Sequence, residues 1–151
     1  MIVYRIADCR YITDLTGTGA ALYGGRWNSK NTYMLYTAQS ASLALLEAIV
    51  HMGKLPPSGF CMARIELPDS IAPAVRPEKL PKEWYTSPPP DVLKGLGDGF
   101  VKRNEFLAMP VPSVLVNEEY NYLINPHHPL APKIRSLETK PMNIDGRIFK
   151  K

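Results

Sequence analysis

Residues 33–53 read YMLYTAQSASLALLEAIVHMG, and this stretch decides the fold because a strand pattern passes directly into a helix pattern. The run at 33–37 is short, apolar and aromatic, which is typical of a strand. Ser40 is placed to cap a helix, since its hydroxyl can accept a hydrogen bond from a free N–H of the first turn. A helix is therefore expected over 40–52, with four apolar side chains at helical spacing on one face: Leu43, Leu46, Ile49 and Val50.

Outside this stretch the sequence predicts mainly short strands. It contains 15 prolines, and proline removes a backbone donor and blocks helix interiors. We expect strands at 2–6, 59–66, 106–116 (one or two), 133–139 and 143–149, a proline-rich connection at 68–90, a short helix at 91–103 broken by Gly95, Gly97 and Gly99, and a turn with a short helical piece at 117–129. This order is not a regular βαβ alternation, so the predicted class is α+β.

The composition is that of one globular domain spanning residues 1–151. No apolar run approaches the roughly 20 residues of a membrane span, and the N-terminus lacks a secretory signal, so a cytoplasmic protein is expected. Cys9 and Cys61 lie far apart without a CxxC pair, which indicates reduced structural thiols and no zinc site. The net charge of +4 suits an anionic partner, but the basic residues are scattered, so direct nucleic-acid binding is not indicated.

The segment Gly24-Gly25-Arg26-Trp27-Asn28 is the first candidate for function. Two glycines let a backbone approach a ligand closely, and an arginine beside them can hold a phosphate with two hydrogen bonds. Tyr36 follows at the end of the predicted strand, where an aromatic ring can line a cleft. Taken singly, each feature is more typical of a purely structural role, as a tight turn or a half-buried tyrosine.

Four further polar positions stand out. Glu47 interrupts the apolar helix, so it lies either at the edge of the apolar stripe or in a polar pocket. Ser113 has no G-x-S-x-G surroundings, so it is not indicated as a hydrolase nucleophile. Asn121 and Asn125 are four residues apart and would face one site if their segment were helical. An Asn-Pro pair is also common in ordinary turns and loops. No set of metal ligands occurs at suitable spacing.

In order, these segments resemble the RES-domain family, which is named for an arginine, a glutamate and a serine. Those three residues fall here on Arg26, Glu47 and Ser113. The resemblance is carried by GTGAALYGGRWN (17–28), MLYTAQSASLALLEAIVH (34–51), PVPSVLV (110–116), NYLINPHHP (121–129) and DGRIF (145–149). Two departures are Asn31, where many members have glycine, and Phe100, which we expect to fill the space of a family tryptophan. Asparagine tolerates a positive φ, so the turn at Asn31 is expected to survive.

The resemblance implies a fold similar to ADP-ribosyltransferases, with a split, mostly antiparallel sheet and flanking helices. It implies a toxin that depletes NAD⁺, as its substrate, by cleaving the bond between nicotinamide and ribose, with no metal. By this resemblance Glu47 stabilises positive charge on the ribose, Arg26 and Arg5 hold the pyrophosphate, and Tyr36 orients the nicotinamide. In the same way Ser113 would bond the ribose or the amide, with Asn121 and Asn125 as further members of the pocket.

The resemblance also implies a partner, a separately encoded helix-turn-helix antitoxin of the Xre type. The acceptor of ADP-ribose stays open between water, phosphate and protein. The sequence leaves three other functions open: an ADP-ribosyltransferase acting on a protein or nucleic acid, a basic toxin that binds or cleaves RNA, and a non-enzymatic binding domain. The retained Arg26, Tyr36, Glu47 and Ser113 argue against loss of activity, and no basic stripe with interleaved aromatics supports RNA binding.

Overall fold

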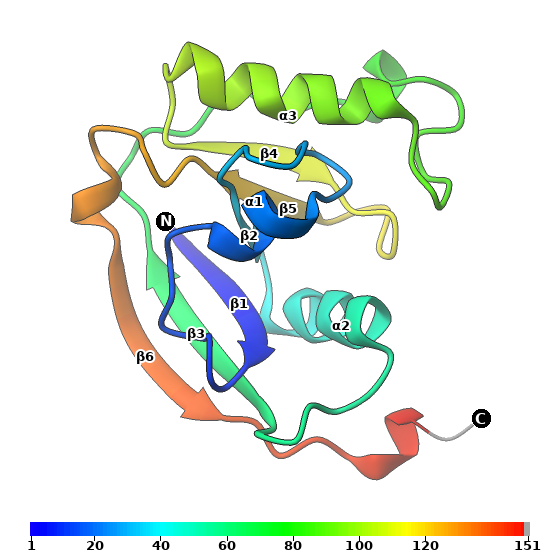
Figure 1. Ribbon diagram of the computed structural model, residues 1–151, viewed down its shortest axis with the longest axis vertical. Helices are drawn as coiled ribbons and strands as arrows, with labels where there is room; N and C mark the ends of the chain where they lie inside the picture. Colours follow the sequence, from blue (N-terminus) through cyan, green and yellow to red (C-terminus); the bar gives the residue numbers. More distant parts are fainter. Residues whose placement is uncertain (150–151) are drawn as a thin grey trace.

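The computed structural model describes residues 1–149, and it has the predicted α+β architecture (Figure 1). Its strands and main helices, in chain order, are β1 (Ile2–Asp8), α1 (Thr18–Tyr23), β2 (Leu35–Ala38), α2 (Ala41–Met52), β3 (Phe60–Glu66), α3 (Asp91–Arg103), β4 (Ala108–Pro112), β5 (Tyr120–Ile124) and β6 (Arg135–Pro141). Three 3₁₀ turns lie at Pro77–Lys79, Ala131–Lys133 and Gly146–Phe149. None of the helices in residues 1–149 is long and apolar enough to cross a membrane.

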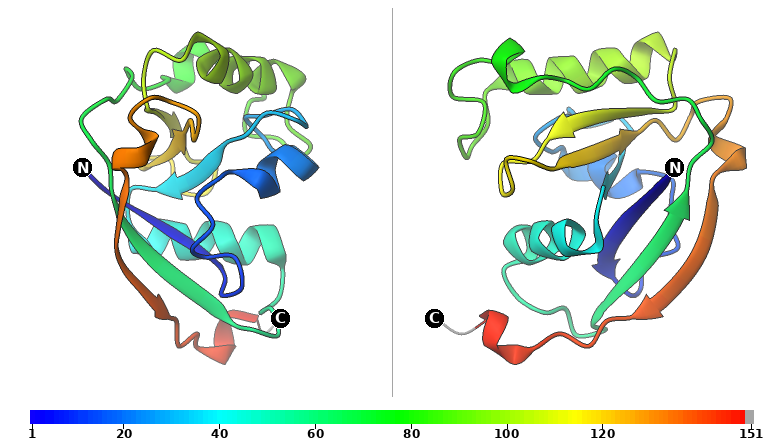
Figure 2. Two further views of the ribbon diagram at one scale, coloured as in Figure 1. Left: turned by 60° about the vertical axis from the view of Figure 1, so that its left-hand side comes forward. Right: turned by 180° about the vertical axis from the view of Figure 1, so that it is seen from behind.

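The six strands form one sheet in the order β4-β5-β2-β1-β3-β6, and every pair of named neighbours is antiparallel. The sheet is nevertheless split, as expected. β1 pairs with β3 over seven residues, whereas β1 and β2 pair only at Tyr4 and Ala38. The sheet therefore consists of a β4–β5–β2 half and a β1–β3–β6 half that meet at this narrow junction (Figure 2).

Apolar clusters cover both faces of the sheet. On one face α2 packs against the β1–β3–β6 half, where Leu43, Ala44 and Ala48 bury against Ile6 and Phe60. On the same face α3 covers the β4–β5–β2 half, as Figure 1 shows, through side chains that include Leu93, Phe100, Val111 and Leu123. The opposite face holds a third cluster built on Val3, Leu35, Ile65 and Ile124. α2 and α3 therefore cover different halves of the same face.

Three predicted elements differ from the structure in the β4–β5–β2 half. Residues 18–23 form a short helix within the glycine-rich segment. α3 runs unbroken through its three glycines, because Leu93, Gly97 and Phe100 all lie on its buried face and packing outweighs helix propensity. The segment at 120–124 is strand β5 rather than a helical piece, since its backbone pairs with both β4 and β2.

The C-terminal expectations were partly right. Strand β6 was predicted at 133–139 and lies at Arg135–Pro141, where it pairs with β3. The second closing strand, predicted at 143–149, is instead an irregular segment ending in the turn at Gly146–Phe149.

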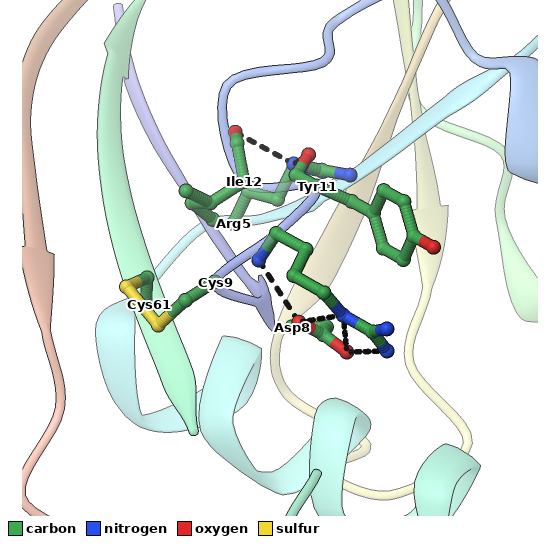
Figure 3. Close-up of a disulfide and its surroundings, with 7 residues drawn as sticks. Arg5, Asp8, Cys9, Tyr11, Ile12 and Cys61 are labelled. Atoms are coloured by element: carbon green, nitrogen blue, oxygen red, sulfur yellow. Dashed lines mark hydrogen bonds and ion pairs between the residues drawn. A yellow bond between two sulfur atoms is a disulfide. The ribbon is translucent and has the colours of Figure 1, made fainter. Parts of the chain in front are cut away.

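The prediction of reduced thiols is wrong, because Cys9 and Cys61 form a disulfide (Figure 3). Their Cα atoms are 4.8 Å apart despite a sequence separation of 52 residues. The antiparallel register explains this closeness: Cys61 pairs with Ala7, and the Cys9 N–H donates to the Gly59 carbonyl just beyond the ladder. Separation along the chain says nothing about two residues that a long β-ladder brings side by side.

Candidate active site

The loop Gly24–Asn28 is held in place by Tyr36 of β2 and by the buried side chain of Asn28. The Tyr36 hydroxyl donates to Asn28 Oδ1 at 2.7 Å and accepts from the Trp27 N–H at 3.1 Å. Asn28 Nδ2 in turn donates to the carbonyls of Ala20, Ser29 and Thr32. A Cβ at Gly25 would come within 2.7 Å of the Tyr36 hydroxyl oxygen, so this position requires glycine. Asn31 adopts the expected positive φ of 74° in the turn that follows.

Arg26 extends from this loop toward the proline-rich connection. Its NH1 donates to the carbonyls of Trp84 and Thr86 at 2.8 and 2.9 Å, so the guanidinium is oriented by backbone atoms more than 50 residues away. Burial lowers the pKa of Arg26 from its ordinary value, and the negative charge of Glu47 opposes that shift. Arginine remains charged at neutral pH. The site thus holds a fixed cation near a carboxylate without a direct ion pair between them.

Glu47 lies on α2, and its carboxylate is bound by two side chains of the β4–β5 hairpin. Asn121 Nδ2 donates to Glu47 Oε1 at 2.8 Å, and the Ser113 hydroxyl donates to the same oxygen at 3.2 Å. Within residues 1–149, Glu47 Oε2 has no hydrogen-bond partner. One carboxylate oxygen of Glu47 is therefore anchored by two side chains of the hairpin. Of the two alternatives that the sequence left open for Glu47, the contacts favour polar surroundings, since the carboxylate is bound by Ser113 and Asn121.

Ser113 is fully buried, with 0% of its surface exposed. Besides donating to Glu47, its Oγ accepts hydrogen bonds from the backbone N–H groups of Leu115 and Val116. A hydroxyl has one proton to donate and two lone pairs to accept with, and all three are used here. Ser113 therefore fixes Glu47 and the turn between β4 and β5.

Arg5 and Asn125 lie apart from this cluster. Arg5 NH1 donates to the carbonyls of Tyr11 and Ile12, as part of the surroundings drawn in Figure 3, and so holds the loop that leads to α1. Burial lowers the Arg5 pKa, and Asp14 opposes the shift. Asn125 is buried beyond the end of β5, where its Nδ2 donates to Asn104 Oδ1 at 2.8 Å. The helical turn expected for this segment is wrong, because residues 120–124 form strand β5. Asn121 and Asn125 also bind different groups, Glu47 and Asn104 respectively.

Three residues that support the site were given no such role in the sequence analysis: Asn28, Gly97 and Asp98. Asn28 is the buried hub described above. Asp98 of α3 accepts a hydrogen bond from the Ser29 N–H at 2.9 Å, and Gly97 packs so closely on the loop that an added Cβ would collide with the Trp27 carbonyl. Phe100 fills the adjacent core, as expected, and is 3% exposed. A glycine in a helix interior is unfavourable without a packing reason, which was the signal available for Gly97.

Two surface hollows lie elsewhere. One, with a volume of about 370 Å³, lies between Leu15 and Ile134, and the other borders Phe100 and Arg103. Neither is lined by Arg26, Tyr36, Glu47 or Ser113. Among residues 1–149, no group of three or more His, Cys, Asp or Glu side chains could hold a metal ion.

A family model described as RES domain matches residues 2–145, almost the full length of the chain. The chain belongs to the RES-domain family. The Arg26, Glu47 and Ser113 suggested by the resemblance all fall within the matched range. Because Ser113 binds Glu47 directly, two of these three residues form one hydrogen-bonded unit in this RES domain.

Relatives along nearly the whole domain are named as toxins. "Toxin Res" of Yersinia enterocolitica serotype O:8 is 39% identical over 130 residues, 85% of this chain and 86% of the relative. The "Prs ADP-ribosylating toxin" of Sphingobium sp. is 37% identical over 143 residues, 91% and 88% of the two chains. "Toxin Res" of Pseudomonas putida is 35% identical over 152 residues, 99% and 100%. These relatives confirm the resemblance to RES-domain toxins.

A solved structure supports the fold. A chain of the crystal structure of the M. tuberculosis MbcT-MbcA toxin-antitoxin complex matches with a TM-score of 0.71, covering 93% of this RES domain and 83% of that chain. At 15% identity this likeness concerns the fold alone.

Proposed function

We propose that this RES-domain protein is the toxin of a toxin–antitoxin pair and that it cleaves the bond between nicotinamide and ribose in NAD⁺. The observation that carries the proposal is the state of Glu47. Its Oε1 is anchored by Ser113 and Asn121, while Oε2 stays free, and the Arg26 guanidinium lies near enough for the two charges to interact. A free carboxylate oxygen and a fixed cation suit a substrate with a developing positive ribose and a negative pyrophosphate.

The chemistry requires little proton transfer. The C1″–N1 bond of NAD⁺ breaks with its electron pair going to the nicotinamide ring, which leaves as a neutral base. Positive charge then develops on the ribose, as in oxocarbenium-like glycosidic cleavage. The nucleophile, water or phosphate, adds to C1″ and loses a proton if it is water. The enzyme's part is to stabilise the ribose charge and hold the dinucleotide.

The residues divide into two groups by what they can reach. Glu47 faces the ribose through Oε2, Arg26 binds the pyrophosphate, and the ring of Tyr36 packs against nicotinamide while its hydroxyl stays on Asn28. Ser113 and Asn121 act through Glu47, since their polar atoms are used on its Oε1. Arg5 and Asn125 are the weaker candidates for contact with NAD⁺, because both side chains are bonded to backbone or side-chain groups outside the cluster.

The proposal includes an antitoxin partner and a subcellular location. The solved neighbour is part of a toxin-antitoxin complex, which supports a cognate antitoxin for this chain; we propose one of the helix-turn-helix, Xre type. We propose that the toxin acts in the cytoplasm.

A second function is favoured by one specific observation. The Sphingobium relative is named an ADP-ribosylating toxin, and it is 37% identical to this chain. In that case the same ribose cation would be captured by a side chain of a target protein rather than by water or phosphate.

Purified toxin incubated with NAD⁺ tests these alternatives. The products are separated by chromatography in buffers with and without phosphate. We expect free nicotinamide together with ADP-ribose, or with ADP-ribose-1″-phosphate where phosphate is the acceptor. NAD⁺ labelled in the adenylate portion, added to a cell extract, would leave label on protein if the second function holds. Stable NAD⁺ in both buffers and an unlabelled extract would contradict both functions.

In cells, expression of Arg26→Ala or Glu47→Ala should abolish toxicity while the fold is retained, as judged by circular dichroism of the purified proteins. Tyr36→Ala should abolish toxicity too, but with a loss of stability, because the Tyr36 hydroxyl holds the loop that carries Arg26. Fully toxic Glu47→Ala would refute the role given to Glu47.

A further inference from the structure

The end of α2 that precedes Glu47 is fastened to the same hairpin that binds the Glu47 carboxylate. The Ser40 hydroxyl donates to Glu119 Oε1 at 2.7 Å while accepting the Leu43 N–H at 3.1 Å. Beside it, the Tyr120 N–H donates to Gln39 Oε1 at 2.7 Å, and the Gln39 N–H donates to the Tyr120 carbonyl. Two side chains and one backbone pair thus tie the start of α2 to the start of β5.

The spacing along α2 links this fastening to the site. Ser40 and Glu47 are seven residues apart, which is two helical turns, so both face the β4–β5 hairpin. The hairpin turn is itself closed, because the Ser113 N–H donates to the Glu119 carbonyl and the Glu119 N–H to the Val116 carbonyl. Glu119 and Ser113 therefore move as one unit, and that unit contacts α2 at both positions.

The fastening continues the β2–β5 ladder from its Ala38–Asn121 pair up to the start of α2. α2 packs mainly on β1, in the β1–β3–β6 half, whereas Glu119 belongs to the β4–β5–β2 half. The ladder between the two halves has the single pair Tyr4–Ala38. The position of Glu47 relative to Arg26 thus depends on contacts between α2 and the hairpin.

We propose that Glu119 and Ser40 are positioning residues for Glu47, forming a latch that sets where the free Oε2 lies. This inference rests on the proposed function only for its kinetic readout. If the latch is lost, α2 can shift against the hairpin, and the carboxylate leaves the place where charge develops. Misplacement of a catalytic group by about 1 Å can reduce a rate by about 10²-fold. Because the group acts mainly in the transition state, kcat should fall while KM stays nearly constant.

Two successive substitutions separate the effect of the Ser40–Glu119 hydrogen bond from the effect of the helix cap at Ser40. Ser40→Asp retains a capping oxygen for Leu43 but brings a second carboxylate against Glu119. We expect kcat for NAD⁺ cleavage to fall about tenfold, with KM within about twofold. Adding Glu119→Gln supplies an amide N–H that can donate to the new carboxylate, so the double variant should return to within about twofold of the wild-type kcat. Ser42→Asp and Glu118→Gln, at exposed neighbouring positions, are the matched controls and should leave kcat unchanged.

A second readout does not need activity. In a two-dimensional ¹H–¹⁵N spectrum, the side-chain amide of Asn121 reports its hydrogen bond to Glu47. That signal should move in Ser40→Asp and return in the double variant. Wild-type kcat and an unmoved Asn121 signal in Ser40→Asp would overturn the latch, as would a loss that appears in KM or that Glu119→Gln does not restore. If wild-type protein leaves NAD⁺ intact, the proposed function fails, and the Asn121 signal alone still decides the latch.

Discussion

The two halves of the sheet are held together in different ways. The β1–β3–β6 half rests on a seven-pair backbone ladder, an apolar cluster under α2 and the disulfide between Cys9 and Cys61. The β4–β5–β2 half has shorter strands, and buried polar groups organise it: Asn28, Ser113 and Asn125 are each at most 1% exposed and all are hydrogen-bonded. The first half is a scaffold, and the second carries most of the candidate site.

This difference has an energetic consequence. A ladder and an apolar cluster tolerate small changes, whereas a buried polar group left without a partner costs about 1–3 kcal/mol. Substitutions in the β1–β3–β6 half should therefore lower stability while activity is retained. Substitutions in the β4–β5–β2 half should lower both.

Removing the disulfide should have the largest effect on stability. In the chain-entropy model, opening a loop of 52 residues lowers the free energy of unfolding by about 4 kcal/mol. Urea unfolding of wild-type toxin with and without dithiothreitol measures the change, and Cys9→Ala serves as the control that should not respond to the reductant. NAD⁺ cleavage below the unfolding transition should persist. A reductant-insensitive midpoint for the wild type would contradict the expectation.

Gly97→Ala should come next, and it should affect both stability and activity. Its Cβ would collide with the Trp27 carbonyl and push α3 from the loop that carries Arg26, with an expected loss of about 3 kcal/mol. Gly95→Ala is a matched control on the same helix, because nothing lies within 4 Å of its added Cβ. It should raise stability by up to about 1 kcal/mol, through helix propensity. Thermal unfolding of the two variants compares them directly, and equal melting temperatures would refute the close contact.

Tyr36→Phe should have a smaller effect, lowering the free energy of unfolding by about 2 kcal/mol. The substitution removes the hydroxyl that bonds Asn28 Oδ1 and the Trp27 N–H, and both groups lie in a buried environment. Tyr23→Phe, at a side chain that is 80% exposed, is the control. Identical urea midpoints for the two variants would mean that the Tyr36 hydroxyl does not hold the loop.

The smallest effect is a dependence on alkaline pH. Burial raises the pKa of Tyr36, although the hydrogen bond from the Trp27 N–H opposes the shift. Because the folded pKa is above the unfolded value of about 10, the contribution to stability is complete below pH 10 and is lost as the pH rises further. Between pH 9 and about 10.5, wild-type toxin should lose about 0.8 kcal/mol more than Tyr36→Phe. Parallel losses in the two proteins would contradict the raised pKa.

The sequence predicted the scaffold better than the site half, for physical reasons. β1, β3 and α2 follow from local periodicity and from the Ser40 cap, which accepts the Leu43 N–H as expected. By contrast, α1, the unbroken α3 and strand β5 depend on contacts with distant residues. Gly97 illustrates this. In the sequence, a glycine within a helical segment indicates a helix break. In the structure, the Trp27 carbonyl lies so close to the helix that only glycine fits at this position.

For the site, the family resemblance supplied the residue types and the structure supplied their arrangement. Glu47 and Ser113 come together through a contact across 66 residues that no local pattern contains. The helical turn expected to bring Asn121 and Asn125 together was wrong, because residues 120–124 form strand β5. The disulfide was missed because pairing between β1 and β3 overrides distance along the chain.

Glu47→Gln tests the central claim most directly. The substituted amide can still accept the bonds from Ser113 and Asn121 through its carbonyl oxygen, so the fold should be retained, while the negative charge near the ribose is removed. The measurement is nicotinamide release from NAD⁺ by purified wild type, Glu47→Gln and the exposed control Glu118→Gln. Equal melting temperatures of the three proteins confirm that the fold is retained. The account predicts release by the wild type and the control, and a rate lower by about 10³-fold for Glu47→Gln. Equal rates for the wild type and Glu47→Gln would contradict it.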